Sequence, residues 1–267
     1  MTGASSGIGL AVARALKDNG YRVIGTSRDP GAIADKLAGV EYLALDLADD
    51  ASIVACAEAA GDVDVLINNA GESQSGPIEE LPPDALHRLF AINVLGPVRL
   101  TQLLVPGMRA RGYGRVVMIG SMLASFPLAY RSSYVASKAA IKGFATAARG
   151  ELSPYGVWLC TVEPGSINTG ISERRTKYIA EDSPYLADFT TMIDALDRNE
   201  KHGISGERVA ETVLAAVEAN KPRAMYAIGS RAPLVFTLRR LAPHSVVEEM
   251  VSRAHGLPGP TTSRRKP

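Results

Sequence analysis

The chain has 267 residues, and its 29 lysines and arginines nearly balance its 28 aspartates and glutamates, which leaves a formal net charge of +1. This balance gives no electrostatic reason to expect a nucleic-acid partner. A hydrophobic share of 46% is typical of an ordinary globular protein. The length suits one α/β domain with a full hydrophobic core.

Cysteine and histidine usage argues against disulfides and metal sites. Cys56 and Cys160 lie in apolar runs, which predicts buried free thiols. The four histidines are scattered, and neither Cys-x-x-Cys nor His-Glu-x-x-His occurs, so we expect no metal. We also expect no secretory leader and no membrane span, and therefore a cytoplasmic protein.

Short β-branched runs alternate with longer Ala- and Leu-rich segments. The predicted strands are residues 21–26, 40–45, 63–68, 115–120, 157–162 and 224–228. The predicted helices are residues 9–19, 49–60, 83–111, 133–153 and 206–219. Several strands are apolar throughout, which is expected when both faces of a sheet are covered. The alternation predicts a single α/β domain over residues 1–258, with a doubly wound, mostly parallel sheet of the Rossmann type.

The first motif in chain order is the turn at residues 2–9, Thr-Gly-Ala-Ser-Ser-Gly-Ile-Gly. Its glycines allow a tight turn and a close approach to a pyrophosphate, and the following helix points free N–H groups at that anion. The turn therefore predicts a phosphate site, with a helix-capping loop as the structural alternative. In this fold a strand should precede the turn, yet only Met1 does. We therefore expect the first strand to be missing or truncated in the sequence as written.

The strand at 21–26 runs into Thr26-Ser27-Arg28, and Asp29 follows only after the arginine. At this position an acidic residue binds the ribose 2′-hydroxyl of NAD, whereas an arginine accommodates a 2′-phosphate. Arg28 therefore predicts a preference for NADP(H) over NAD(H), with a solvated turn residue as the alternative.

Residues 134–138 read Tyr-Val-Ala-Ser-Lys at the start of a long helical pattern. The four-residue spacing places Tyr134 and Lys138 on one helix face. A free tyrosine has a pKa of about 10, and a nearby ammonium stabilises the phenolate. The pair is thus a candidate for acid–base catalysis, with a packed tyrosine and a solvated lysine as the alternative.

Together these motifs resemble the short-chain dehydrogenase/reductase family over residues 2 to about 169. The matching segments are residues 2–9, Asp46-Leu47, Asn68-Asn69-Ala70-Gly71, Asn93, Ser121, Tyr134 with Lys138, and Pro164-Gly165-Ser166-Ile167-Asn168-Thr169. The resemblance implies hydride transfer between a nicotinamide and an alcohol or carbonyl carbon. Loop composition favours a small, apolar substrate.

The resemblance also implies a role for each catalytic residue. Ser121 would hydrogen-bond the substrate oxygen, and Tyr134 would act as general acid or base. Lys138 would stabilise the phenolate and hold the nicotinamide ribose, while Asn93 would position a water that relays protons to Lys138. The expected cofactor contacts are Thr2, Gly3, Ser5, Ser6, Gly7, Ile8, Gly9, Arg28, Asp46, Leu47, Asn69, Ala70, Gly71, Tyr134, Lys138, Pro164, Gly165, Ile167 and Thr169.

Two regions depart from the alternation of strands and helices. Residues 170–204 are charged and follow the carboxyl end of a strand, which predicts a substrate lid or a surface helix pair that packs its own aromatics. Residues 259–267 are rich in Pro, Ser and Arg and predict a disordered tail. The stretches 234–241 and 246–251 are amphipathic. We expect them to pack on the core, with a membrane surface or a partner protein as the alternatives.

The helices at 83–111 and 133–153 carry more apolar positions than one sheet-facing stripe needs, which predicts a homodimer or homotetramer. Two other functions are open. Gly3-x-Ser5-x-Gly7 also fits the nucleophile pattern of a serine hydrolase, with His202 or His244 as its base. A cofactor-binding sensor without turnover would keep the fold alone.

Overall fold

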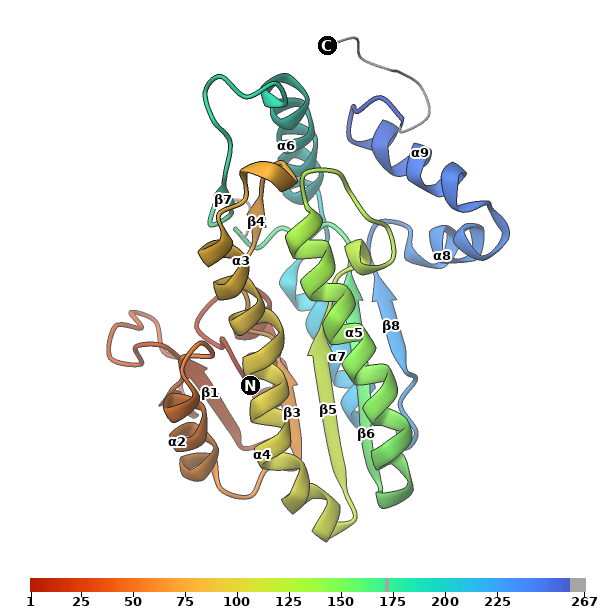
Figure 1. Ribbon diagram of the computed structural model, residues 1–267. Coiled ribbons are helices and arrows are strands. Elements are labelled where there is room, and N and C mark those ends of the chain that lie inside the picture. Colours follow the sequence, from red (N-terminus) through yellow and green to blue (C-terminus); the bar gives the residue numbers. More distant parts are fainter. Residues whose placement is uncertain (171–172, 260–267) are drawn as a thin grey trace.

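A computed structural model, which describes residues 1–170 and 173–259, confirms the α/β fold of the Rossmann type with a mostly parallel sheet (Figure 1). The main sheet has the strand order β3-β5-β6-β8, and a second parallel pair joins β1 to β2. Their bounds are β1 Val23–Ser27, β2 Val40–Ala44, β3 Val65–Asn68, β5 Gly114–Ile119, β6 Val157–Pro164 and β8 Met225–Ile228. All six predicted strands are present, with ends shifted by one or two residues.

Residues 1–4 lie between β1 and β3, where the two sheets are not paired directly. The Met1 ammonium donates to the Ile24 carbonyl at 2.9 Å, and the Thr26 N–H donates to the Met1 carbonyl at 3.0 Å. On the other side, the Thr2 N–H donates to the Ile67 carbonyl at 2.9 Å. Burial lowers the pKa of the Met1 amino group to about 6. The backbone of Met1 and Thr2 therefore bridges the gap between the two sheets.

Helices cover both faces of the sheet (Figure 1). One face carries α1 Gly7–Asp18 and α7 Gly206–Glu218, and the other carries α2 Asp50–Ala60, α4 Gly96–Arg111 and α5 Ser132–Leu152. Strand β5 shows the consequence, since Val117 and Ile119 pack in the first layer while Val116 and Met118 pack in the second. Both faces are buried, as the continuous apolar runs predict.

Both cysteines are buried free thiols, as predicted. Cys160 belongs to β6, and burial raises the pKa of its thiol to about 12. A thiol that stays protonated near neutral pH is a packing residue rather than a nucleophile.

The predicted helix at 83–111 is a continuous helical stretch with a wider turn in its middle. It consists of α3 Pro83–Phe90, a π-helical turn at Ala91–Leu95 and α4. In the described part of the chain, this is the one helix long and apolar enough to cross a membrane, with a mean hydropathy of 1.4. Half of that window is buried, and its apolar side chains pack on the sheet, as in the core helix of a globular domain.

The charged insertion contains β7 Thr176–Lys177, which pairs with β4 Gln74–Ser75, and α6 Leu186–Lys201. Phe189 and Met192 of α6 pack with Leu128 and Leu257, so the insertion forms a small hydrophobic cluster together with the segment after β5 and the C-terminal segment. The remaining helices are α8 Ala232–Leu241, α9 His244–Ala254 and the 3-10 turns Ile78–Glu80, Met122–Ala124 and Ser153–Tyr155. Residues 171–172 of the predicted lid and 260–267 of the predicted tail lie outside the described residues.

The turn before α1 depends on a close backbone approach at Gly9. A Cβ atom there would lie 1.9 Å from the Gly3 carbonyl oxygen and 2.7 Å from Asn69 Nδ2. We expect Gly9→Ala to lower the free energy of unfolding by about 1–3 kcal/mol, because the turn must shift to admit the methyl group. Urea denaturation measures this change.

Gly143 is the matched control, since it is an exposed helical glycine and a methyl group added to it would meet no described neighbour within 4 Å. Gly143→Ala should raise the free energy of unfolding by up to about 1 kcal/mol through helix propensity. Equal effects of the two substitutions would show that the contact at Gly9 does not limit stability.

Candidate active site

A cavity of about 1010 Å³ opens at the carboxyl ends of the parallel strands. Ligands of open α/β sheets bind at this edge. The cavity brings together most of the residues predicted from sequence. Those that line it are Gly3, Ser5, Ser6, Gly7, Ile8, Arg28, Asp46, Leu47, Asn69, Ala70, Gly71, Ser121, Tyr134, Lys138, Pro164, Gly165, Ile167 and Thr169. Thr2, Gly9 and Asn93 lie behind its wall.

The glycine-rich turn lines the cavity between the ends of β1 and β3. Gly3 and Gly7 have positive φ angles of 65° and 54°, a conformation that favours glycine. Thr2 Oγ1 accepts the N–H groups of Asn69 and Ala70 at 2.9 and 3.0 Å, which fastens the turn to the end of β3. Thr2 therefore shapes the turn from behind.

Arg174, from the charged insertion, reaches this turn and was not predicted from the sequence. Its Nη1 donates to Ser6 Oγ at 3.1 Å, and its Nη2 donates to the Thr169 carbonyl at 3.4 Å. The N-terminus of α1, the serine hydroxyls and this guanidinium together fit the pyrophosphate of a dinucleotide. A separation of 168 residues from Ser6 left no sequence signal for the contact.

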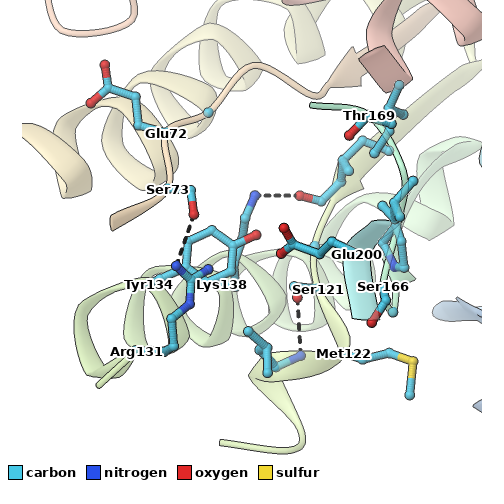
Figure 2. A pocket seen from close by; sticks show the side chains of 18 of the residues that line it. Glu72, Ser73, Ser121, Met122, Arg131, Tyr134, Lys138, Ser166, Thr169 and Glu200 are labelled. Carbon is cyan, nitrogen blue, oxygen red and sulfur yellow. Dashed lines mark hydrogen bonds between the residues drawn. The ribbon is translucent and has the colours of Figure 1, made fainter. Parts of the chain in front are cut away.

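Ser121, Tyr134 and Lys138 line the cavity near the end of β5 (Figure 2). Tyr134 and Lys138 lie in the first two turns of α5, and Lys138 Nζ is 5.8 Å from the centre of the tyrosine ring. Lys138 Nζ also donates to the Ile119 carbonyl at 2.9 Å, which fixes the ammonium at the end of β5. Ser121 follows that strand closely, and its Oγ accepts the Leu123 N–H at 3.2 Å.

Asn93 lies in the π-helical turn and binds the loop that borders the cavity. Its Oδ1 accepts the Glu72 N–H at 2.8 Å, and its Nδ2 donates to the Glu72 carbonyl at 3.0 Å and to Ser137 Oγ at 3.2 Å. A π turn often marks a functional position in a helix. Here it points the Asn93 amide at the loop after β3; the water relay to Lys138 stays a prediction.

Comparison with known proteins agrees with this geometry. The sequence profile described as short chain dehydrogenase matches residues 1–179. The chain belongs to the short-chain dehydrogenase/reductase family. Dehydrogenase/reductase SDR family member 7B from Bos taurus is 34% identical over 271 residues, which cover 95% of this chain and 80% of the relative.

Solved structures show the same family likeness. A short-chain dehydrogenase from Streptomyces avermitilis has a TM-score of 0.79 and 34% identity, and the match covers 94% of this chain and 95% of that one. A short chain dehydrogenase from Burkholderia cenocepacia, solved in complex with NADP, has a TM-score of 0.75 and 25% identity over 94% of each chain.

The serine-hydrolase alternative loses its support in this short-chain dehydrogenase/reductase. Ser5 lines the cavity, but neither candidate histidine does. His202 Nδ1 contacts the Arg198 carbonyl at 2.8 Å, and His244 contacts Glu248 at 3.2 Å. No triad therefore forms around Ser5 from the histidines proposed for it.

Arg131 is a second cavity residue that the sequence analysis missed. It is only 2% exposed, and its Nη1 donates to Ser73 Oγ, the Gln74 carbonyl and Ser75 Oγ at 2.9–3.0 Å. Its guanidinium lies 4.3 Å from the centre of the Tyr134 ring. Burial lowers the pKa of Arg131 to about 10, which leaves it charged at neutral pH. Its position three residues before Tyr134 was the available signal.

An ion pair with a buried carboxylate and a partly exposed lysine supports the loop behind Ser121. Lys142 Nζ lies 3.0 Å from a carboxylate oxygen of Glu163, which is fully buried at the end of β6. The same ammonium donates to Ser125 Oγ at 2.7 Å, and Thr161 Oγ1 donates to Glu163 at 3.0 Å. Lys142 therefore ties the loop after Ser121 to the strand that leads into Pro164.

The outer wall of the cavity is largely apolar, with Arg239 of α8 and His255, directly after α9, as polar exceptions. Its hydrophobic residues come from the turn after β5 and from helices α6, α8 and α9: Met122, Leu123, Phe126, Leu196, Val235, Leu238, Val247, Met250, Val251 and Ala254. Leu238 and Met250 are also 39% and 48% exposed, so the apolar lining continues to the molecular surface.

Removing Lys142 should expose the role of the buried pair. We expect Lys142→Met to destabilise the protein by about 3 kcal/mol, because it leaves the Glu163 carboxylate buried without its cation. The double variant Lys142→Met/Glu163→Gln should regain part of that loss, because the buried charge is gone. Urea unfolding of the two variants tests this. A double variant no more stable than Lys142→Met would contradict the ion-pair account.

Proposed function

We propose that this short-chain dehydrogenase/reductase transfers a hydride between NADP(H) and an alcohol or carbonyl carbon of a small, largely apolar molecule. One observation carries the proposal: Ser121, Tyr134 and Lys138 line the same cavity as a glycine-rich phosphate turn. This arrangement fits a cofactor that would lie along the cavity, with its reactive ring beside Tyr134.

In the proposed mechanism the bound cofactor supplies or accepts the hydride. In the reductive direction Tyr134 gives its phenolic proton to the carbonyl oxygen as the hydride reaches the carbonyl carbon, which yields the alcohol. Ser121 donates a hydrogen bond to the same oxygen and orients it. The Lys138 ammonium, held by the Ile119 carbonyl, stabilises the negative charge left on the phenol.

The preference for NADP(H) rests on the end of β1. Ser27 and Arg28 both line the cavity there. The Asp29 carboxylate is engaged elsewhere, because its Oδ1 accepts the N–H groups of Gly31 and Ala32 at 2.8 and 3.2 Å. Arg28 is thus the charged residue of this segment that faces the cofactor space, where it favours a 2′-phosphate. The structural relative from Burkholderia cenocepacia was solved with NADP.

Two further proposals concern the insertion at residues 170–204 and the assembly of the protein. The insertion lines the cavity with Arg174, Thr176, Tyr178, Leu196 and Glu200, which supports its role as a substrate lid.

The homo-oligomer stays a prediction. It is supported by Leu95 and Phe144, which are 61% and 47% exposed on the two helices expected to pair.

Tyr134→Phe tests the catalytic proposal. We expect the variant to lose about 10²–10⁴-fold in kcat, because it cannot exchange the proton, while its Kd for NADPH changes little. NADPH oxidation with a panel of ketones gives kcat, and NADPH fluorescence gives Kd. Tyr155→Phe is the control, since Tyr155 is 54% exposed and outside the cavity.

The outcome also separates the alternatives. Near-normal turnover in Tyr134→Phe would refute the assigned acid. A wild-type protein that binds NADPH tightly but turns over no substrate would favour the sensor, and ester hydrolysis without cofactor would favour the hydrolase.

Arg28→Ala tests the cofactor preference. We expect wild-type kcat/KM to be higher with NADPH than with NADH, and the variant to lose most of that advantage, because the charge-assisted hydrogen bonds to the 2′-phosphate are gone. Arg22→Ala is the matched control, since Arg22 is exposed, pairs with Glu41 at 3.0 Å and lies outside the cavity. A wild-type preference for NADH would overturn the proposal.

A further inference from the structure

Beyond the catalytic residues, the cavity borders a charge cluster in which Arg175 and Glu200 are buried and Asp197 is partly exposed. The Arg175 side chain is 0% exposed, and its two terminal nitrogens donate separately to the two carboxylates, Nη1 to Asp197 and Nη2 to Glu200. The cluster joins the segment that leads into β7 to α6. Burying charges in this way is unfavourable unless their hydrogen bonds are satisfied.

Glu200 and Asp197 differ in what they face. Glu200 lines the cavity, whereas Asp197 does not. Figure 2 shows the Glu200 carboxylate pointing into the cavity from the side opposite Ser73, toward the end that holds Tyr134. Arg131 lines the same end and lies over the tyrosine ring. The polar cluster therefore borders the position at which the reacting carbonyl is proposed to lie.

One half of the Glu200 carboxylate is unsatisfied. Oε1 accepts from Arg175, while Oε2 is buried with no hydrogen-bond partner in the part of the chain that the structure describes. Glu200 is 9% exposed, and burial raises its pKa, with Arg175 acting in the opposite direction. A buried acceptor without a donor is destabilising, because it has lost its hydrogen bonds to water and gained none in the protein. Because Oε2 has almost no accessible surface in this structure, a ligand reaches it when the Glu200 side chain rotates slightly, and a donor placed there would satisfy the oxygen.

The surrounding charges indicate which donor fits. Arg131 and Arg175 already balance Asp197 and Glu200, and Lys177 lies 4.0 Å from Asp197. A further cation would add positive charge beside Arg131 and Arg175. A hydroxyl group donates the same hydrogen bond without adding charge. The apolar wall from α8 and α9 then suits a hydrocarbon portion of the same molecule.

We propose that Glu200 is a specificity-determining residue and that the substrate is a hydroxylated carbonyl compound: a hydrocarbon with a hydroxyl group close to the reacting carbonyl. The hydroxyl donates to Glu200 Oε2 while the carbonyl oxygen faces Ser121 and Tyr134, and the hydrocarbon lies along α8 and α9. This inference rests on the proposed oxidoreductase function of the same cavity.

The test compares three ketones that share one hydrocarbon chain: 2-decanone, 1-hydroxy-2-decanone and 1-amino-2-decanone. We expect wild-type kcat/KM with NADPH to be at least about tenfold higher for the hydroxy ketone than for the plain ketone, because a site built to bind a hydroxyl discriminates against the analogue that lacks it. Glu200→Met should bring that ratio close to one. The ratio is measured within one enzyme preparation, so a reduced folded fraction cancels.

Asp197→Asn is the matched control, because Asp197 binds the same arginine but does not face the cavity; it should keep the wild-type ratio. If Glu200→Met does not fold, Glu200→Gln provides the second variant, since its amide can still pair with Arg175 while it presents an uncharged group to the cavity. Its ratio should fall below that of wild type. A ratio of one in the wild type, an unchanged ratio in the Glu200 variants, an equal fall in Asp197→Asn, or preference for the amino ketone would overturn the inference.

Failure of the proposed function has a different signature. If NADPH oxidation is absent with all three ketones and with a broader carbonyl panel, the oxidoreductase proposal fails. If the plain ketone is reduced as well as the hydroxy ketone and Tyr134→Phe abolishes both reactions, the oxidoreductase proposal holds and only the role of Glu200 fails.

Discussion

Because the strands run parallel, their carboxyl ends all meet at one edge of the sheet. Because helices bury both faces of the sheet, polar groups are placed in the loops at this edge rather than in the interior. Five segments lie at this edge: the phosphate turn, the Arg28 segment, the loop after β3, Ser121 and the segment from Pro164 to Thr169. The cavity is a consequence of this arrangement. Segments far apart in sequence become neighbours because each follows a strand of the same sheet or, in the case of the turn, adjoins one.

Buried polar contacts fix the positions of the loops at the carboxyl edge of the sheet. Thr2 fastens the turn to β3, Asn93 fastens the next loop to α5, and Lys142 with Glu163 fastens the loop after Ser121 to β6. Each contact removes polar groups from water, which is favourable only when their hydrogen bonds are completed. These residues therefore act as positioning groups for the side chains that face the ligand. The free oxygen of Glu200 is the contrast, since the described part of the protein does not complete it.

The electrostatic character of the cavity changes along its length. The turn and Arg174 present donors and positive charge, which suit phosphates. The end near Tyr134 combines a buried arginine, a lysine and a carboxylate, while the walls from α8 and α9 are largely apolar. Under the proposed function, this gradient would orient a dinucleotide and an amphipathic substrate head to tail, with the reacting atoms beside Tyr134.

The sequence by itself determined the strands, the helices that cover them and the cofactor turn, because these features have local signals: apolar runs, helical periodicity and glycine spacing. It also determined the pairing of Tyr134 with Lys138, since a spacing of four residues fixes one helix face. Only the tertiary structure decided that Arg174 reaches Ser6, that Asn93 lies in a π turn, and that Arg175 and Glu200 pair beside the cavity. Arg174 is 168 residues from Ser6, Asn93 is 21 residues from Glu72, and Arg175 is 25 residues from Glu200. At such separations the fold of the intervening chain decides whether two side chains meet, and no periodic pattern in the sequence predicts it.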